Sequence, residues 1–450
     1  MRVKNILLIV ASLLFYSYGE PIYILLMLVS SAMNYAAGRL LGREQTGLSE
    51  GARIFSPKRR KGALVAALAL NLAFLAVFKY AGMLVGTLDT LFGLSLTIPV
   101  VALPIGISFY TFQAMSYIID VYRGETREAK SFLKVLLYIS FFPQLTAGPI
   151  IKYHDVDEQL DSRTTSLPDI AAGIRRFTVG LGKKVLIANT MAVVADSIYG
   201  APLAEVNVAV AWIGALAYLA QIYFDFSGYS DMALGLARMF GFCYKENFNY
   251  PYISSSIQEF WRRWHISLST WFKEYLYFPL GGNRKGKARA GLNKVVVFVC
   301  CGMWHGASWT FVIWGLFHGL FLLLEEYVPI KKLPKALGVV YALLVVTIGF
   351  VLFRADSLDQ AGYFIMQMFT GFHFETASIS LALSQLTPAF IFTFIVAIIA
   401  CTPVKQRFTS ALENNGILRT GSFALSIVLL LVCLFSLSSG GYNPFIYFRF

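Results

Sequence analysis

Long apolar runs recur along the whole chain, and they constrain its fold more than any other feature. Many of them approach the ~20 residues that an α-helix needs to cross a bilayer. They lie near residues 6–18, 21–38, 63–88, 99–119, 132–151, 176–199, 207–224, 293–324, 336–353, 387–402 and 421–438. The runs are continuous, whereas barrel strands alternate, and lipid offers no water to unpaired backbone groups. The sequence therefore predicts an all-α, polytopic integral membrane protein with about eleven crossings.

The distribution of basic residues predicts the orientation of these helices. The formal net charge is +13, which is compatible with a nucleic-acid partner, but Lys and Arg also collect in the cytoplasmic loops of membrane proteins. Seven basic residues lie between the second and third runs, and none lies in residues 89–99: Arg39, Arg43, Arg53, Lys58, Arg59, Arg60 and Lys61. We therefore predict a cytoplasmic N-terminus, the lipid bilayer as the charged partner and no nucleic acid.

Two kinds of segment depart from simple spanning helices. Prolines and glycines interrupt the apolar residues around 103–125 and 141–153. Irregular backbone at membrane depth must be covered by protein or water. We therefore predict broken or re-entrant helices around an internal cavity. Residues 256–278 carry charges, aromatics at helical spacing and an S-x-x-E capping pattern. We predict one amphipathic helix there, followed by a basic loop, with the region 256–294 at the cytoplasmic surface.

The candidate site is a group of histidines in apolar sequence. His265, His305 and His318 are three of the five histidines in the chain, and ionisable residues within spans are functional candidates by default. On one unbroken helix His305 and His318 would point about 140° apart. A break near Gly302, Gly306 or Gly315 would let both border one cavity, with His305 at a loop or helix start. Trp314 precedes His318 by one helical turn and could shape an acyl pocket.

Other polar residues admit both structural and functional interpretations. Asp225 and Asp231 lie in apolar sequence, where one could orient a histidine or pair with an arginine such as Arg238. The cationic residues Arg262, Arg263, Arg284 and Lys285, the last two in a glycine-rich loop, could bind the phosphates of a donor or touch lipid headgroups. The five cysteines form no C-x-x-C pair, so no metal site is expected. Phosphate-loop, G-x-S-x-G and H-E-x-x-H motifs are absent, which gives no support to hydrolase or nucleotide-driven chemistry.

Several motifs together resemble the membrane-bound O-acyltransferase family, and most closely its bacterial alginate O-acetylation branch. They are "EFWRRWHISLSTWFKEYLYFPLGGNR" and "GMWHGASWTFVIWGLFHG", with "FFPQLTAGPI", "YFDFSGYSDMALGLARMFGF" and the C-terminal "NPFIYFRF". The resemblance covers most of the chain. It implies a single transmembrane domain over residues 1–450, with a core at about 104–325 and a central funnel or tunnel.

The resemblance also implies a reaction. An acetyl group would pass from cytoplasmic acetyl-CoA, with no tightly bound cofactor, to an extracytoplasmic polysaccharide, with His318 as the catalytic base and His305 beside it. His265, Trp304, Trp314 and Asp225 are the expected tunnel-lining residues. An SGNH-like acetyltransferase or esterase and the polysaccharide machinery are the implied partners, in a bacterial inner membrane. The open alternatives are D-alanyl transfer from a carrier protein to teichoic acid and, in another class, a polysaccharide or lipid transporter.

Overall fold

The structure is a computed structural model, and within its described residues all regular structure is helical, as the sequence predicts. The described residues are 1–42, 57–95, 102–404, 416–439 and 444–446. Of the predicted cytoplasmic residues, Arg43 and Arg53 lie outside these ranges. The chain groups into two compact units, a first unit of Met1–Gly173 with Leu236–Lys245 and a second unit of Ile174–Gly235 with Glu246–Phe450. The interpretation of the chain as one domain stays a prediction.

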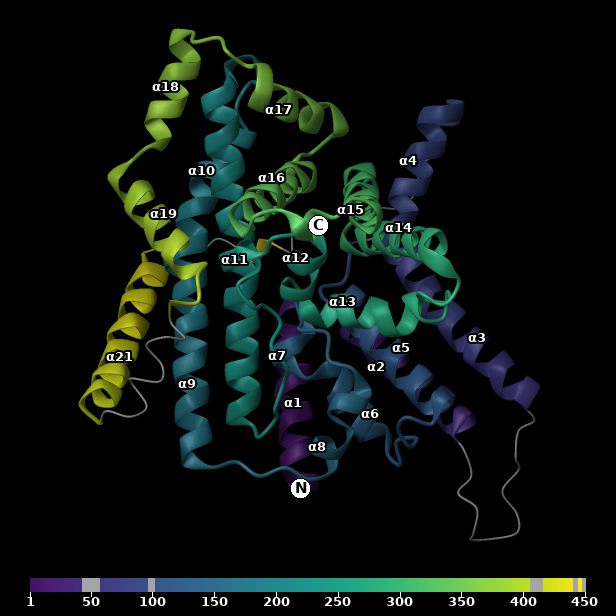
Figure 1. Ribbon diagram of the computed structural model, residues 1–450. Helices are drawn as coiled ribbons and strands as arrows, with labels where there is room; N and C mark the ends of the chain where they lie inside the picture. Colours follow the sequence, from purple (N-terminus) through teal and green to yellow (C-terminus); the bar gives the residue numbers. More distant parts are fainter. Residues whose placement is uncertain (43–56, 96–101, 405–415, 440–443, 447–450) are drawn as a thin grey trace, which may run out of the picture. The chain divides into compact units, whose positions relative to one another are not determined.

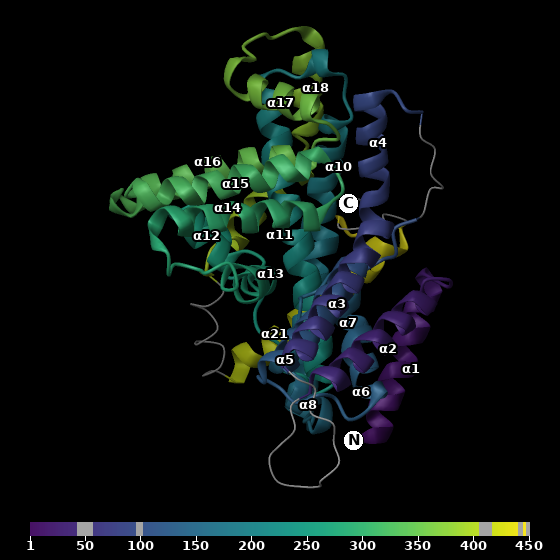
Figure 2. The same ribbon diagram turned by 90° about the vertical axis from the view of Figure 1, so that its right-hand side faces the viewer.

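The helices vary widely in length (Figures 1 and 2). The helices that begin before residue 167 are α1 (Arg2–Gly19), α2 (Ile24–Leu41), α3 (Pro57–Leu75), α4 (Ala81–Phe92), α5 (Ile107–Arg123), α6 (Phe132–Ser140), α7 (Phe142–Leu145) and α8 (Asp157–Asp161). They are followed by α9 (Leu167–Gly182), α10 (Asn189–Tyr199), α11 (Val208–Met239), α12 (Ile257–Arg263), α13 (Ile266–Phe272), α14 (Gly286–His305), α15 (Trp309–Tyr327), α16 (Lys335–Arg354), α17 (Leu358–Thr370), α18 (Thr376–Gln385), α19 (Pro388–Ala400) and α21 (Gly416–Ser438).

Seven helices among the described residues are long and apolar enough to cross a membrane, or eight if the bent pair α18 and α19 forms one span. This is fewer than the eleven apolar runs in the sequence. The run at 132–151 breaks into α6 and α7, each too short to cross. The run at 293–324 is divided between α14 and α15. Apolar length alone overcounts spans because short helices buried against protein are just as apolar.

Polar groups and close backbone contacts hold the first unit together. Asn34 of α2 and Asn71 of α3 are both fully buried, and their side-chain amides donate to each other at 3.1 and 2.8 Å. Such interhelical amide pairs join helices where lipid supplies no hydrophobic drive between them. The α2 backbone also lies against α5, because a Cβ at Gly38 would fall 2.1 Å from the hydroxyl oxygen of Tyr117. Glycine at 38 thus lets the tyrosine ring pass between the two helices.

The predicted interruption at residues 141–153 is confirmed. After α7 the chain runs without helix from residue 147 to 152, and these residues are buried in the first unit. Their polar groups find protein partners: the Tyr138 hydroxyl donates to the carbonyl of Ile151 at 2.7 Å, and the Gly148 N–H donates to the carbonyl of Gln144 at 3.0 Å. Protein covers the irregular backbone here, as membrane depth requires.

Candidate active site

The stretch that carries His305 and His318 forms a tight helical hairpin in the second unit. α14 ends at His305, Gly306 follows with extended backbone, and the Ser308 hydroxyl accepts the Thr310 N–H at 3.3 Å to cap α15. The predicted break near the glycines is therefore confirmed, although His305 ends the first helix and does not begin the second. Figure 2 shows α14, α15 and α16 stacked side by side.

Gly302 and Gly315, two of the three glycines considered as break points, do not interrupt a helix. A Cβ at Gly302 would lie 2.1 Å from the Phe311 carbonyl oxygen, and a Cβ at Gly315 would lie 2.2 Å from the Phe298 carbonyl oxygen. Both glycines sit inside helices and allow α14 and α15 to touch backbone to backbone, as small residues do at helix interfaces in membranes. Only Gly306 marks the break. The close packing fixes the register that places both histidines against Trp314.

Aromatic rings connect the three histidines. Trp314 lies between His305 and His318, with its ring centre 5.1 Å from each of them. His265 lies 6.5 Å from His305, ring centre to ring centre. Trp304 fills the space beside this pair, at 5.1 Å from His305 and 6.1 Å from His265. The structure thus brings together five of the residues that the sequence singled out, and all five are buried.

His318 is almost completely enclosed by protein. It is 1% exposed and is flanked by Trp261 at 5.2 Å and by Phe317 at 5.4 Å between ring centres. Its Nε2 faces the backbone of Gly349 in α16, where a Cβ would lie only 2.6 Å away. Its Nδ1 has no hydrogen-bond partner among the described residues. This buried nitrogen is thus a ring atom whose hydrogen-bonding capacity is not used by the described residues.

His265 is held by a polar network and interrupts the predicted amphipathic helix. Its left-handed φ of +43° separates α12 from α13, so the prediction of one helix over 256–278 is wrong. The Asn247 side-chain oxygen accepts from the Ser267 N–H at 3.1 Å and lies 3.2 Å from His265 Nδ1. Because that oxygen only accepts, Nδ1 carries the proton and Nε2 keeps its lone pair. Burial lowers the pKa of His265 and keeps the ring neutral.

The aromatic faces of the predicted helix are nevertheless buried, and its start is capped as expected. The Ser256 hydroxyl accepts the Glu259 N–H at 3.0 Å. A second cap was not foreseen from the sequence: Glu325 of α15 accepts the N–H groups of Ile257 and Gln258 at 2.6 and 2.9 Å. This carboxylate ties the start of α12 to the helix that bears His318. The position of Trp261 beside the histidine follows from that connection.

A small apolar cavity lies next to the histidines. Its volume of about 10 Å³ is roughly the space that one water molecule needs and lies well below the volume of ligand pockets. Its lining residues are Ile222, Phe226, Trp264, His305, Trp314, Phe350, Phe353 and Ile446. Of the expected tunnel-lining residues Trp314 is at the wall, whereas Trp304 and His265 are not among the lining residues. His318 is also not a lining residue, and its ring packs directly against that of Trp314.

Asp225 is not among the lining residues of this cavity. Its carboxylate is 1% exposed, pairs with Lys184 at 2.6 Å and accepts the backbone N–H of Ile446 at 2.7 Å. Lys184 in turn donates to the carbonyl of Pro444 at 3.2 Å. The aspartate neutralises the partly buried Lys184 and holds Ile446, which forms part of the cavity wall. Its contribution to the cavity is the position of Ile446.

Asp231, which lies in α11 together with Asp225, also has a structural role. Asp231 pairs with Lys183 at 2.7 Å and with Arg176 at 2.9 Å in the second unit. Arg238 pairs instead with Asp169 at 3.1 Å in the first unit, so the expected contact between Arg238 and an aspartate of α11 does not form. An ion pair made by residues from neighbouring helices cannot be recognised from the spacing in a single helix.

The four basic residues considered for phosphate binding have different surroundings. Arg262 is exposed, whereas Arg263 is held by Glu259 at 3.0 Å and by the carbonyl of Asn249 at 3.1 Å. Arg284 and Lys285 are exposed in the loop after α13. In this loop the N–H groups of Gly281 and Gly282 already donate to the carbonyls of Phe278 and Tyr277. Side chains, rather than these two glycine N–H groups, are thus what the loop can offer an anion.

The sequence reasoning missed the contribution of α16. Gly349, Phe350 and Phe353 of this helix contact His318, the cavity and His305, the last with ring centres 5.2 Å apart. In the sequence they belong to an ordinary apolar run. The one available signal was a glycine in the middle of that run, since an interior glycine often marks a close approach.

These features define a multi-pass helical membrane protein with a buried cluster of histidines beside an apolar cavity. The family model described as MBOAT, membrane-bound O-acyltransferase family, matches residues 63–329, and the chain belongs to this family. It is therefore an O-acyltransferase, and this assignment replaces the alternative of a polysaccharide or lipid transporter.

Similar proteins indicate which branch of the family the chain resembles. A probable alginate O-acetylase AlgI of Pseudomonas putida is 39% identical over an alignment that covers 100% of this chain and 95% of its own length. A peptidoglycan O-acetyltransferase of Helicobacter pylori is 35% identical, covering 79% of this chain and 71% of its own. A teichoic acid D-alanyltransferase of Bacillus subtilis is 30% identical over 55% of this chain and 67% of its own.

Proposed function

We propose that this O-acyltransferase takes an acetyl group from cytoplasmic acetyl-CoA for the O-acetylation of an extracytoplasmic polysaccharide. The similarity to an alginate O-acetylase over the full chain supports this choice, because the similarity to a D-alanyltransferase is weaker and covers about half of it. The bacterial relatives favour a bacterial inner membrane as the location.

The observation that carries the mechanism is the contact of His318, Trp314 and His305 in one buried row. In the proposed reaction neutral His318 accepts the proton of the attacking hydroxyl group through Nδ1. The hydroxyl oxygen attacks the thioester carbonyl carbon, and the bond between that carbon and sulfur breaks. The CoA thiolate then takes the proton from the imidazolium. General base catalysis of this kind contributes about 10² to 10⁴ in rate. His305 borders the cavity and would orient the acyl group.

The neighbouring residues have supporting tasks in this proposal. Trp314 separates the two histidines and forms part of the cavity wall, while Trp304 and His265 fix the orientation of His305 from behind. The exposed Arg262, Arg284 and Lys285 are the available contacts for the phosphates of CoA, whereas Arg263 is already engaged by Glu259. A second protein on the outer face, of the SGNH-like kind that the family resemblance implies, would pass the acetyl group to the polymer.

The donor can be tested in inverted membrane vesicles, which expose the cytoplasmic face and retain membrane partners. Vesicles that contain the chain should release CoA from labelled acetyl-CoA and acquire label in polymer, whereas vesicles without it should not. An acidic carrier protein would also be attracted to the exposed basic loop. Transfer from a D-alanyl carrier protein, with no turnover of acetyl-CoA, would therefore replace the proposal by the D-alanyl alternative.

A further inference from the structure

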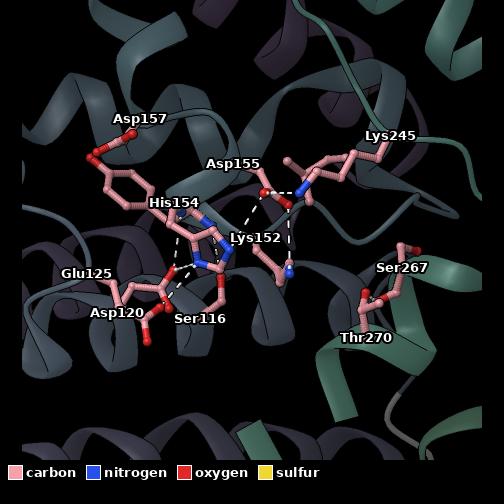
Figure 3. Close-up of polar contacts among 12 residues, drawn as sticks. Ser116, Asp120, Glu125, Lys152, His154, Asp155, Asp157, Lys245, Ser267 and Thr270 are labelled. Carbon is pink, nitrogen blue, oxygen red and sulfur yellow. Dashed lines mark hydrogen bonds and ion pairs between the residues drawn. The ribbon is translucent and has the colours of Figure 1, made fainter. Parts of the chain in front are cut away.

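A second cluster of titratable groups lies in the first unit, within the residues described there. Asp120 near the end of α5 is fully buried, Glu125 follows that helix, and His154 lies in the one-turn helix Tyr153–Asp155 (Figure 3). The His154 Nδ1 is 3.0 Å from Asp120 Oδ2 and 3.5 Å from Glu125 Oε2. One ligand atom from each of the three residues lies within 4.8 Å of the others. Three groups that can bind a cation therefore converge on one point.

The two separations measured from His154 fit a metal coordination shell. Zinc binds histidine nitrogen and carboxylate oxygen at about 2.0–2.2 Å, which places neighbouring ligands of a tetrahedral site about 3.3 Å apart. The two separations from His154 Nδ1, 3.0 and 3.5 Å, lie on either side of that value. The Glu125 side chain is 43% exposed, whereas Asp120 is at 0%. The cluster thus has a buried anchor and an open side.

A carboxylate lies near the other ring nitrogen of His154, on the side where metal sites place an outer contact, although it is beyond hydrogen-bond distance. The other ring nitrogen, Nε2, lies 3.6 Å from Asp155 Oδ1. Asp155 is itself held by Lys245 at 2.6 Å and by Lys152 at 3.9 Å, as Figure 3 shows. A ligating histidine usually directs its free N–H to a carboxylate, which fixes the tautomer and the ring orientation. The ring of His154 is placed with Nδ1 toward the other two groups and Nε2 toward this carboxylate.

We propose that Asp120, Glu125 and His154 form a binding site for a divalent first-row metal ion, with zinc as the best-fitting ion. An imidazole ligand favours zinc over magnesium, which prefers an octahedral shell of oxygens. The ion would join the end of α5 to the segment at residue 154, and the fourth position would be open to solvent at Glu125. Nothing in this assignment depends on the acyl donor or on the histidines of the second unit.

A hydrogen-bonded ion pair is the competing explanation for the same geometry. The hydrogen bond to Asp120 raises the pKa of His154 above its ordinary value, although partial burial opposes this. A proton can thus occupy the place between Nδ1 and the carboxylate that a metal ion would take. Removal of Glu125 distinguishes the proton from the metal ion. A proton shared by His154 and Asp120 does not need the glutamate, whereas a metal ion needs it as a ligand.

The test is a Co²⁺ and Zn²⁺ titration of the full chain in lipid nanodiscs after treatment with chelator. We expect one saturable equivalent, with the visible absorption of Co²⁺ bound by nitrogen and oxygen and without a thiolate band from the exposed Cys243. Glu125→Gln and His154→Gln should each weaken binding by at least 100-fold. Asp155→Asn should weaken it about 10- to 100-fold, as loss of an outer contact does. Glu128→Gln, on the same segment, is the matched control and should bind like the unaltered chain.

Circular dichroism and thermal unfolding would establish that each variant is folded, and Asp120 is left unchanged because it is fully buried. Lack of saturable binding by the unaltered chain would overturn the proposal in favour of the ion pair. Equal binding by the unaltered chain, Glu125→Gln and His154→Gln would overturn it as well. Displacement of Zn²⁺ by equimolar Mg²⁺ would contradict the assignment of the ion.

Discussion

Replacement of Gly349 by alanine tests whether the position of His318 matters, without altering the histidine itself. The new methyl group would lie 2.6 Å from Nε2 and 3.2 Å from Cε1 of the imidazole ring. Ordinary carbon contacts are about 3.5–4.0 Å, so the ring or α16 must move by about 1 Å. A displacement of this size at a catalytic group can cost about 100-fold in rate. We expect acetyl transfer to fall by that order in Gly349→Ala.

The same variant should remain folded, because added volume of one methyl group in a packed interior typically costs 1–3 kcal/mol. Gly362→Ala is the matched control: Gly362 lies in α17, and no atom would be within 4 Å of the added methyl group. That control should keep its activity and gain up to about 1 kcal/mol, since alanine is the better helix residue. CoA release from acetyl-CoA and thermal unfolding in nanodiscs measure the two effects. Wild-type turnover by a folded Gly349→Ala protein would refute the account of His318.

Two further predictions concern buried polar pairs. Asp225→Asn should lower the free energy of unfolding by about 3–5 kcal/mol, because Lys184 would lose its buried partner. The double variant with Lys184→Met should regain much of this loss. Unfolding of the single variant at the wild-type temperature would contradict the prediction. Asn34→Ala should cost about 1–3 kcal/mol because the buried Asn71 side-chain oxygen would lose its donor, although the Asn71 amide nitrogen keeps the carbonyl of Ala67. Changing both residues to leucine should cost less. A larger loss in the double leucine variant, measured by the same unfolding assay, would show that the amide pair itself is required.

The sequence predicted much of the candidate site because its members lie close together along the chain. His305, Trp314 and His318 belong to one hairpin, and the helical angle between the two histidines required a break that the structure has at Gly306. The aromatic residues of 256–278 were expected on an amphipathic helix, and most of them are buried, although His265 divides the segment into two helices. Local geometry was sufficient for these conclusions.

The contacts that the sequence did not predict are made between distant segments. Gly349 meets His318 across 31 residues, as follows from their numbers in the sequence, and Asp225 meets Ile446 across 221. The left-handed backbone at His265 depends on Asn247, whose side chain receives the Ser267 N–H and whose carbonyl receives the Ile266 N–H. Helical periodicity cannot reveal such a constraint. The cluster around His154 is of the same kind, since His154 follows Asp120 by 34 positions and Glu125 by 29.

The rate of acetyl-CoA turnover by His318→Ala tests the central claim most directly. His373→Ala, which alters a histidine outside the cluster, is the control for the loss of an imidazole. If His318 is the general base, turnover in inverted vesicles should fall by about 10² to 10⁴ with the fold retained, and the control should match the unaltered chain. Turnover by His318→Ala at the unaltered rate would contradict the account and transfer the catalytic role to another residue.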